Sequence, residues 1–210
     1  MSTKKTTTPG RPMPPAALLE SPWLSFAPAP EVQRWIHQTF LAEQSRLFND
    51  EHAHLEHAHF EVLWASTGFT RQGRSVLGQC EQVTFRTGAW QKGRQEQQMR
   101  DWFGAVPDFL ITLDAAYSAQ CSDLEFCALV EHELYHIGQE RDAFGAPAFT
   151  RSGMPKLTMR GHDVEEFVGV VRRYGASKDV QHLVDAAQRG PEVAKLDIAR
   201  ACGTCLLKLA

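Results

Sequence analysis

The chain has 210 residues, enough to bury a full hydrophobic core as one domain. Its 22 Lys and Arg residues against 25 Asp and Glu residues give a net charge of -3, which supplies no basic surface for nucleic acid or for an anionic membrane. We therefore expect neither a nucleic-acid partner nor a membrane partner.

The N-terminal region differs in composition from the rest of the chain. Seven of the 11 prolines fall within residues 1–30, where proline blocks helical hydrogen bonding and no apolar period is present. This pattern predicts a disordered Pro-rich tail over residues 1–30, followed by a single domain over residues 31–210.

Localisation is indicated by what the sequence lacks. It has no apolar run of the kind found in secretory signals and no stretch approaching the roughly 18 apolar residues of a membrane span. Its five cysteines are an odd number with irregular spacing, which favours reduced thiols over a disulfide framework. We expect a soluble, cytoplasmic protein.

Hydrophobic periodicity predicts the order of the elements. The expected elements are a helix from Glu31 toward Asn49, a helical piece over 51–60, strands over 60–66, 81–88 and 107–117, a helix from Ser122, a loop over 144–159, and helices at about 163–174, 179–189 and 192–208. Three short strands thus precede the helix that begins at Ser122. This order predicts an α+β fold, with a small sheet of about three strands packed on that helix and helices on either side.

The helix after Ser122 has clear boundaries. Ser122 and Glu125 form a capping box, in which each side chain accepts a hydrogen bond from the other residue's backbone N–H. An apolar stripe faces the core and consists of Cys127, Val130, Leu134 and Ile137. Gly138 predicts the end of the helix.

The same helix carries the sequence HELYH. His132 and His136 are four residues apart, so both imidazoles project from one face and can occupy two vertices of a tetrahedral zinc site. Glu133 follows the first histidine and is placed to reach a metal-bound water as a general base. The motif therefore predicts a Zn²⁺ site with a catalytic glutamate.

A catalytic zinc needs three protein ligands and one open position, so a third ligand is required. The sequence RGHDVEEF offers His162, directly before a predicted helix. Glu166, or its neighbour Glu165, is the competing ligand. Asp163 and Glu166 also form a capping box pattern. In addition, Asp163 could accept a hydrogen bond from a ligating imidazole.

These motifs resemble those of the phage metallopeptidase family, a group of short HExxH proteins from bacteriophages and prophages. The resemblance rests on VPDFLITL, ALVEHELYHIG and PKLTMRGHDVEEFVGVVRRYG, and it covers about residues 50–175. It implies a zincin-like fold, metal ligands at His132, His136 and His162, and a catalytic Glu133. The chain is also loosely similar to SprT-like minimal zincins, but its sequence lacks their four-cysteine zinc ribbon.

The resulting hypothesis is a zinc-dependent metallopeptidase that hydrolyses peptide bonds through a zinc-bound water activated by Glu133. It would act on a protein or peptide substrate inside a bacterium that carries the phage. The alternative is a non-catalytic, zinc-stabilised binding or regulatory protein. Neither the substrate nor the oligomeric state follows from the sequence. Candidates for the group that stabilises the oxyanion are Arg172, Arg173, Tyr174 and His182.

Two further patterns have simpler interpretations. The segment EHAHLEHAHF contains His52, His54, His57 and His59, and its spacing favours a solvated helix face over a second metal site. Cys202 and Cys205 have the spacing of a redox motif but follow a helical run, which favours helix packing.

Overall fold

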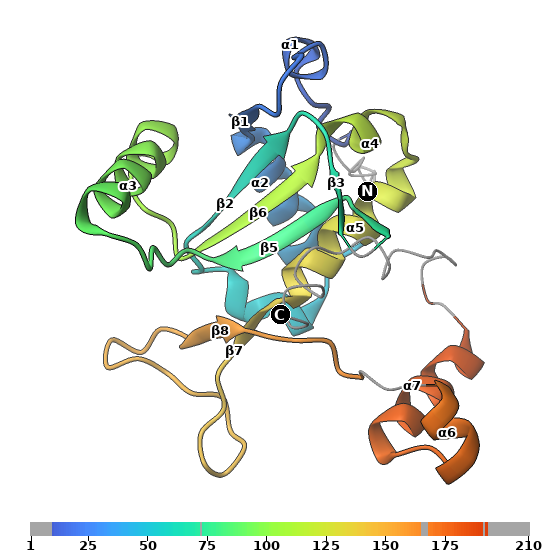
Figure 1. Cartoon of the computed structure of the whole chain (residues 1–210). Helices are drawn as coiled ribbons and strands as arrows, with labels where there is room; N and C mark the ends of the chain where they lie inside the picture. Colours follow the sequence, from blue (N-terminus) through green and yellow to red (C-terminus); the bar gives the residue numbers. More distant parts are fainter. Residues whose placement is uncertain (1–9, 72, 165–167, 191, 193–210) are drawn as a thin grey trace, which may run out of the picture.

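The computed structural model describes residues 10–71, 73–164, 168–190 and 192 (Figure 1). Its elements, in chain order, are α1 (Ala16–Leu19), β1 (Phe26–Pro28), α2 (Pro30–Ile36), the π-helical segment η1 (His37–Leu41), the 3₁₀ helix η2 (Asp50–Leu55), β2 (Phe60–Ala65), β3 (Phe69–Arg71), β4 (Arg74–Val76), β5 (Gly78–Gln82), α3 (Ala89–Phe103), β6 (Phe109–Asp114), α4 (Ala115–Gln120), α5 (Asp123–Tyr135), β7 (Ile137–Gln139), β8 (Leu157–Met159), α6 (Val168–Tyr174) and α7 (Lys178–Arg189). The expected α+β class is confirmed.

A four-stranded sheet in the order β1-β2-β6-β5 forms the centre of the molecule. β2 and β6 run parallel, with Val62 opposite Ile111, while β1 and β5 are antiparallel edge strands. Both central strands are short apolar runs buried on two faces, as expected for the inside of a sheet. Two further ladders, β3–β4 and β7–β8, are separate antiparallel pairs.

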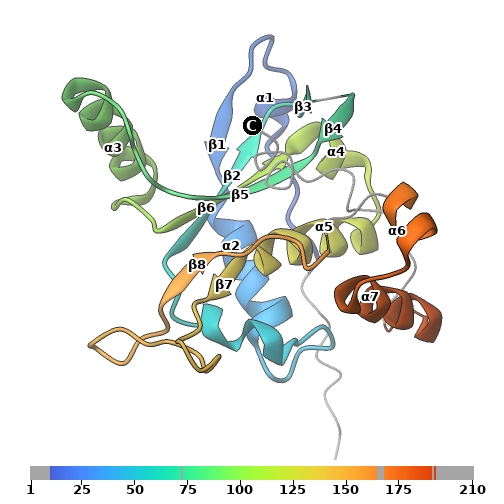
Figure 2. The same cartoon turned by 60° about the horizontal axis from the view of Figure 1, so that its bottom comes forward.

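The main core lies between the sheet and the helices α2 and α5, which follow one face of it (Figures 1 and 2). Successive strand residues point to opposite faces, so Val62 and Trp64 enter this core while Leu63 faces away. On the other face, α3 packs Met99 against Leu63 and Leu110 in a second, smaller cluster. The sheet therefore has helices on both faces, and α5 lies on the larger core.

The N-terminal segment differs from the sequence expectation. Residues 10–30 were expected to be disordered, but they contain α1 and β1, and β1 pairs with β2. Pro28 ends this edge strand, a position where a missing backbone donor is tolerated. Residues 1–9 lie outside the described residues, and the grouping of residues 31–210 into one domain stays a prediction.

Several element boundaries also differ. The helix expected up to Asn49 ends at Leu41, and the strand expected over 81–88 is β5, shifted toward the N-terminus. The sequence did not predict α3, because its exposed surface carries no continuous apolar stripe. Most of the helix expected over 192–208, with Cys202 and Cys205, lies outside the described residues. Among the helices that the structure describes, none has the length and apolar character needed to cross a bilayer.

Arg11 joins the N-terminal segment to the start of α5. Its side chain is 10% exposed and its Nε donates to Asp123 Oδ1 at 2.7 Å. The guanidinium also donates to the carbonyl oxygens of Ser118 and Cys121. It lies over the Phe126 ring, 5.4 Å from the centroid. One partly buried cation thus holds the α4–α5 junction.

We expect Arg11→Ala to lower the free energy of unfolding by about 2–3 kcal/mol, because several hydrogen bonds to a charged group are lost together. Urea denaturation would measure the change. Arg94→Ala is the matched control, since Arg94 is exposed on α3. Equal stability of the two variants would contradict the anchoring role of Arg11.

Candidate metal centre

The helix α5 positions the HELYH motif, and its start is the predicted capping box. Ser122 Oγ accepts from the backbone N–H of Glu125 at 3.3 Å, and Glu125 Oε2 accepts from the backbone N–H of Ser122 at 2.8 Å. The helix ends at Tyr135, with His136 as its C-terminal cap. Gly138, expected to stop the helix, instead lies in β7.

The chain returns to the end of α5 through the β7–β8 ladder (Figure 2). The ladder extends by one residue, because Arg160 N–H donates to the His136 carbonyl at 2.8 Å. A side chain at position 138 would come within 3.0 Å of Arg160 Cβ, so glycine permits this close pairing. His162, two residues further on, is thereby brought beside α5.

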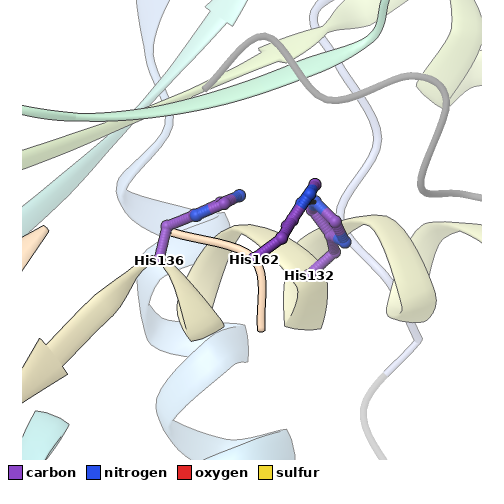
Figure 3. Close-up of side chains that lie close together, drawn as sticks. All are labelled: His132, His136 and His162. Atoms are coloured by element: carbon purple, nitrogen blue, oxygen red, sulfur yellow. Dashed lines mark hydrogen bonds between the residues drawn. The ribbon is translucent and has the colours of Figure 1, made fainter. Parts of the chain in front are cut away.

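The three predicted histidines converge (Figure 3). Each of His132, His136 and His162 offers one ring nitrogen, and these atoms all lie within 4.8 Å of one another. The Nε2 atoms of His132 and His162 are 3.3 Å apart. Two nitrogens bound at about 2.05 Å to one tetrahedral zinc would be separated by about 3.3 Å. The donor set and its spacing therefore fit a metal such as zinc.

Hydrogen bonding fixes the orientation of His136. Its Nδ1 lies 2.8 Å from the carbonyl oxygen of Arg160. A carbonyl can only accept, so Nδ1 carries the proton and Nε2 keeps its lone pair for a metal. This is the arrangement usually found for histidines that bind metals.

His132 is held in its neutral form. Burial, followed by the proximity of His136 and His162, lowers the pKa of His132 to about 4. In the unfolded chain its pKa is near 6.5, so folding is disfavoured progressively as the pH falls from about 6.5 toward 4, where the unfolded chain binds a proton that the folded chain does not. Near pH 7 the imidazole needs no deprotonation to bind a metal.

Glu133 is fully buried on the sheet side of the motif. A side chain at Gly78 of β5 would meet Glu133 Oε1 at 2.8 Å and Leu129 Cδ1 at 2.9 Å. The absence of a Cβ on this edge strand therefore makes room for the glutamate. Gly78 could not be recognised from the sequence, because the contact depends on how β5 packs on α5.

A cavity of about 350 Å³ opens beside the histidines. It is lined by Glu51, His132, Tyr135, His136, Arg160, Gly161, His162 and Asp163. Successive residues of an α-helix are rotated by about 100° about its axis. Viewed along the axis of α5, Glu133 therefore projects about 80° to one side of the mean direction of His132 and His136, and Tyr135 projects about 80° to the other side. The glutamate and the Tyr135 wall of the cavity thus flank the convergence of the three imidazoles.

The other candidates from the sequence fall in different places. Asp163 lines the cavity, but its Oδ1 pairs with Arg160 Nη2 at 2.7 Å. Glu165 and Glu166 lie outside the described residues, so the capping box at this helix is not described either. The four oxyanion candidates, Arg172, Arg173, Tyr174 and His182, lie on the exposed α6 and α7, and none is among the described residues that line the cavity.

Tyr135 and Arg160 also line the cavity, and neither was predicted from the sequence as a site residue. Tyr135 stands inside the motif itself, and burial, chiefly, raises the pKa of its phenol to about 12. The guanidinium of Arg160 lies 5.7 Å from the centre of the Tyr135 ring. The sequence signal that could have identified Tyr135 as a cavity residue was its position in the motif helix, one residue before His136.

An α+β fold with three converging histidines on and beside an HExxH helix is the arrangement of zincin-like metallopeptidases. A family model described as putative phage metallopeptidase matches residues 33–188, which is 156 of the 210 residues. The chain therefore belongs to this phage metallopeptidase family. Comparisons with curated proteins and with solved structures gave no match.

We expect Gly78→Ala to destabilise the fold by about 1–3 kcal/mol, because the added methyl group overpacks the contact with Glu133 and Leu129. Gly93→Ala in α3 is the control: apart from its chain neighbours and the backbone of its own helix, no atom lies within 4 Å of its added methyl group, and alanine favours a helix by up to about 1 kcal/mol. Chemical denaturation of both variants measures the difference. A Gly78→Ala protein as stable as the parent would show that this contact is not tight.

Proposed function

We propose that the protein is a zinc-dependent peptidase whose metal ligands are His132, His136 and His162 and whose general base is Glu133. The observation that carries the proposal is the convergence of three imidazole nitrogens beside an open cavity. Three imidazoles are a donor set that zinc accepts readily.

The same observation favours catalysis over a purely structural zinc. A structural zinc is usually closed by four protein ligands, whereas a catalytic zinc keeps one position for water or substrate. Among the described residues, the cluster has three members, and all three line the cavity. The cavity gives a substrate access to the remaining position.

Zinc bound here would polarise the scissile carbonyl and lower the pKa of a water ligand. Glu133 would accept the proton of the attacking water and return it to the leaving amine. Its burial against Gly78 keeps the carboxylate away from bulk water. His136, oriented by the Arg160 carbonyl, keeps Nε2 directed at the site.

The substrate class follows from the family. A metallopeptidase acts on protein or peptide chains, and the phage family supports an action inside a phage-infected or prophage-carrying bacterium. The polar cavity wall formed by Glu51, Tyr135, Arg160 and Asp163 would contact the substrate beside the scissile bond.

Zinc content tests the ligand set. We expect one zinc per chain in protein that has been stripped with a chelator and reloaded, and loss of stoichiometric zinc in His132→Ala, His136→Ala and His162→Ala. Native mass spectrometry measures the stoichiometry. His57→Ala, at an exposed histidine, should retain zinc. Retention in His162→Ala would exclude that residue as a ligand, and absence of zinc from the parent would exclude the proposal.

Glu133→Gln tests the chemistry separately from the metal. We expect this variant to retain one zinc per chain and to lose at least 100-fold in kcat/KM on an unstructured protein such as casein, because the amide cannot accept the proton. The zinc-loaded parent and His57→Ala provide the reference rates. A Glu133→Gln variant that cleaves at the rate of the parent would remove Glu133 from the mechanism, and cleavage by neither protein would favour the non-catalytic alternative.

A further inference from the structure

The histidine-rich segment does not form the solvated face that its sequence indicated. His52 in η2 is fully buried, and His54 is half-buried, while His57 and His59 are exposed. Burial of two histidines is costly unless their polar atoms have partners or their rings pack closely. We therefore expect His52 and His54 to make specific contacts with the rest of the fold.

Asn49 caps the start of η2 and contacts α5. Its Oδ1 accepts from the Glu51 backbone N–H at 3.1 Å. Its Nδ2 donates to Glu131 Oε1 and to the Tyr135 hydroxyl, each at 2.9 Å. One amide group thus ties the start of η2 to two successive turns of the motif helix.

His52 and His54 extend this contact. The His52 ring packs on the Tyr135 ring with centroids 4.5 Å apart, and His52 Nε2 lies 3.7 Å from Glu131 Oε1. His54 Nε2 lies 2.6 Å from the Ile137 carbonyl oxygen. Because a carbonyl only accepts, His54 donates this hydrogen bond.

The three residues that this segment contacts are sequence neighbours of the two motif histidines. Glu131 directly precedes His132, Tyr135 directly precedes His136, and Ile137 directly follows His136. The segment thus contacts the side chains of the residues that precede both motif histidines, and it contacts the backbone at the start of β7, the strand whose pairing with β8 returns His162. No contact of the segment with the imidazoles themselves is needed for this effect.

We propose that Asn49 and His54 are positioning residues that preorganise the metal centre by fixing the helix end at which His132 and His136 lie. This inference rests on the proposed metal site. Residues that support metal ligands from outside typically change metal affinity about 10–100-fold when they are removed. The effect should appear in the geometry of the bound metal as well as in affinity.

The test uses the full chain and four variants. Asn49→Asp is isosteric and keeps the oxygen that caps η2, but it loses the donors to Glu131 and Tyr135. His54→Ala removes the donor to Ile137, and His54→Gln restores a donor of similar reach. His57→Ala is the control, with the same change three residues away at an exposed site.

Zinc affinity is measured by competition with a chromogenic chelator, and geometry by the visible absorption of the Co²⁺-loaded protein. The thermal midpoint of each metal-free protein is recorded beside them. We expect Asn49→Asp and His54→Ala to bind zinc about 10–100-fold more weakly and to alter the Co²⁺ spectrum. His54→Gln should lie within about 3-fold of the parent, and His57→Ala should match it.

The outcomes separate this inference from the proposed function. If the positioning role is right, neither Asn49→Asp nor His54→Ala matches the parent in both zinc affinity and Co²⁺ spectrum. A match in both would overturn that role, even where the metal-free variants melt at a lower temperature. A loss in His54→Ala that His54→Gln does not restore would overturn the role of the hydrogen bond to Ile137. A parent chain that binds no zinc would overturn the proposed metal site itself.

Discussion

His162 lies 26 positions after His136, and the antiparallel pairing of β7 with β8 returns the chain to the end of α5 over these residues. Arg160 connects this strand pairing to the histidine cluster. Its backbone N–H donates to the carbonyl of His136, and its own carbonyl accepts from the His136 imidazole. One residue therefore fixes both the tautomer of the second motif histidine and the approach of the third. Without this ladder, α5 would present two histidines and the cluster would lack its third member.

The local parts of this arrangement could be read from the sequence. The capping box at Ser122, the spacing of His132 and His136, and the apolar strands β2 and β6 each depend on residues close together in the chain. His162 could be named as a candidate beside Glu166, because a catalytic zinc would need a third ligand and because His162 stands before a predicted helix. These features follow from helix geometry and coordination chemistry without knowledge of the tertiary structure.

The parts that could not be predicted depend on distant contacts. β1 forms from a proline-rich segment because β2 offers it an edge, and Arg11 is partly buried because the α4–α5 junction presents carbonyl oxygens to it. His52 and His54 are polar in the sequence, and their burial follows only from the packing of η2 on α5. Gly78 matters because Glu133 lies against it. In each case the decisive partner is more than 20 residues away.

The arm between Gln139 and Leu157 shows how this architecture can change during evolution. It turns at Gly145 and Gly153, both with positive φ, and exposes Phe144 almost completely. Since the register that brings His162 beside His136 is set by the three residue pairs at the base of the arm, the tip can lengthen or shorten without moving the histidines. Doubling such a loop costs only about 0.6 kcal/mol in closure entropy. The arm is thus a site where related phages can diversify sequence, and where a label or a foreign domain can be inserted, while the spacing of the three imidazoles is preserved.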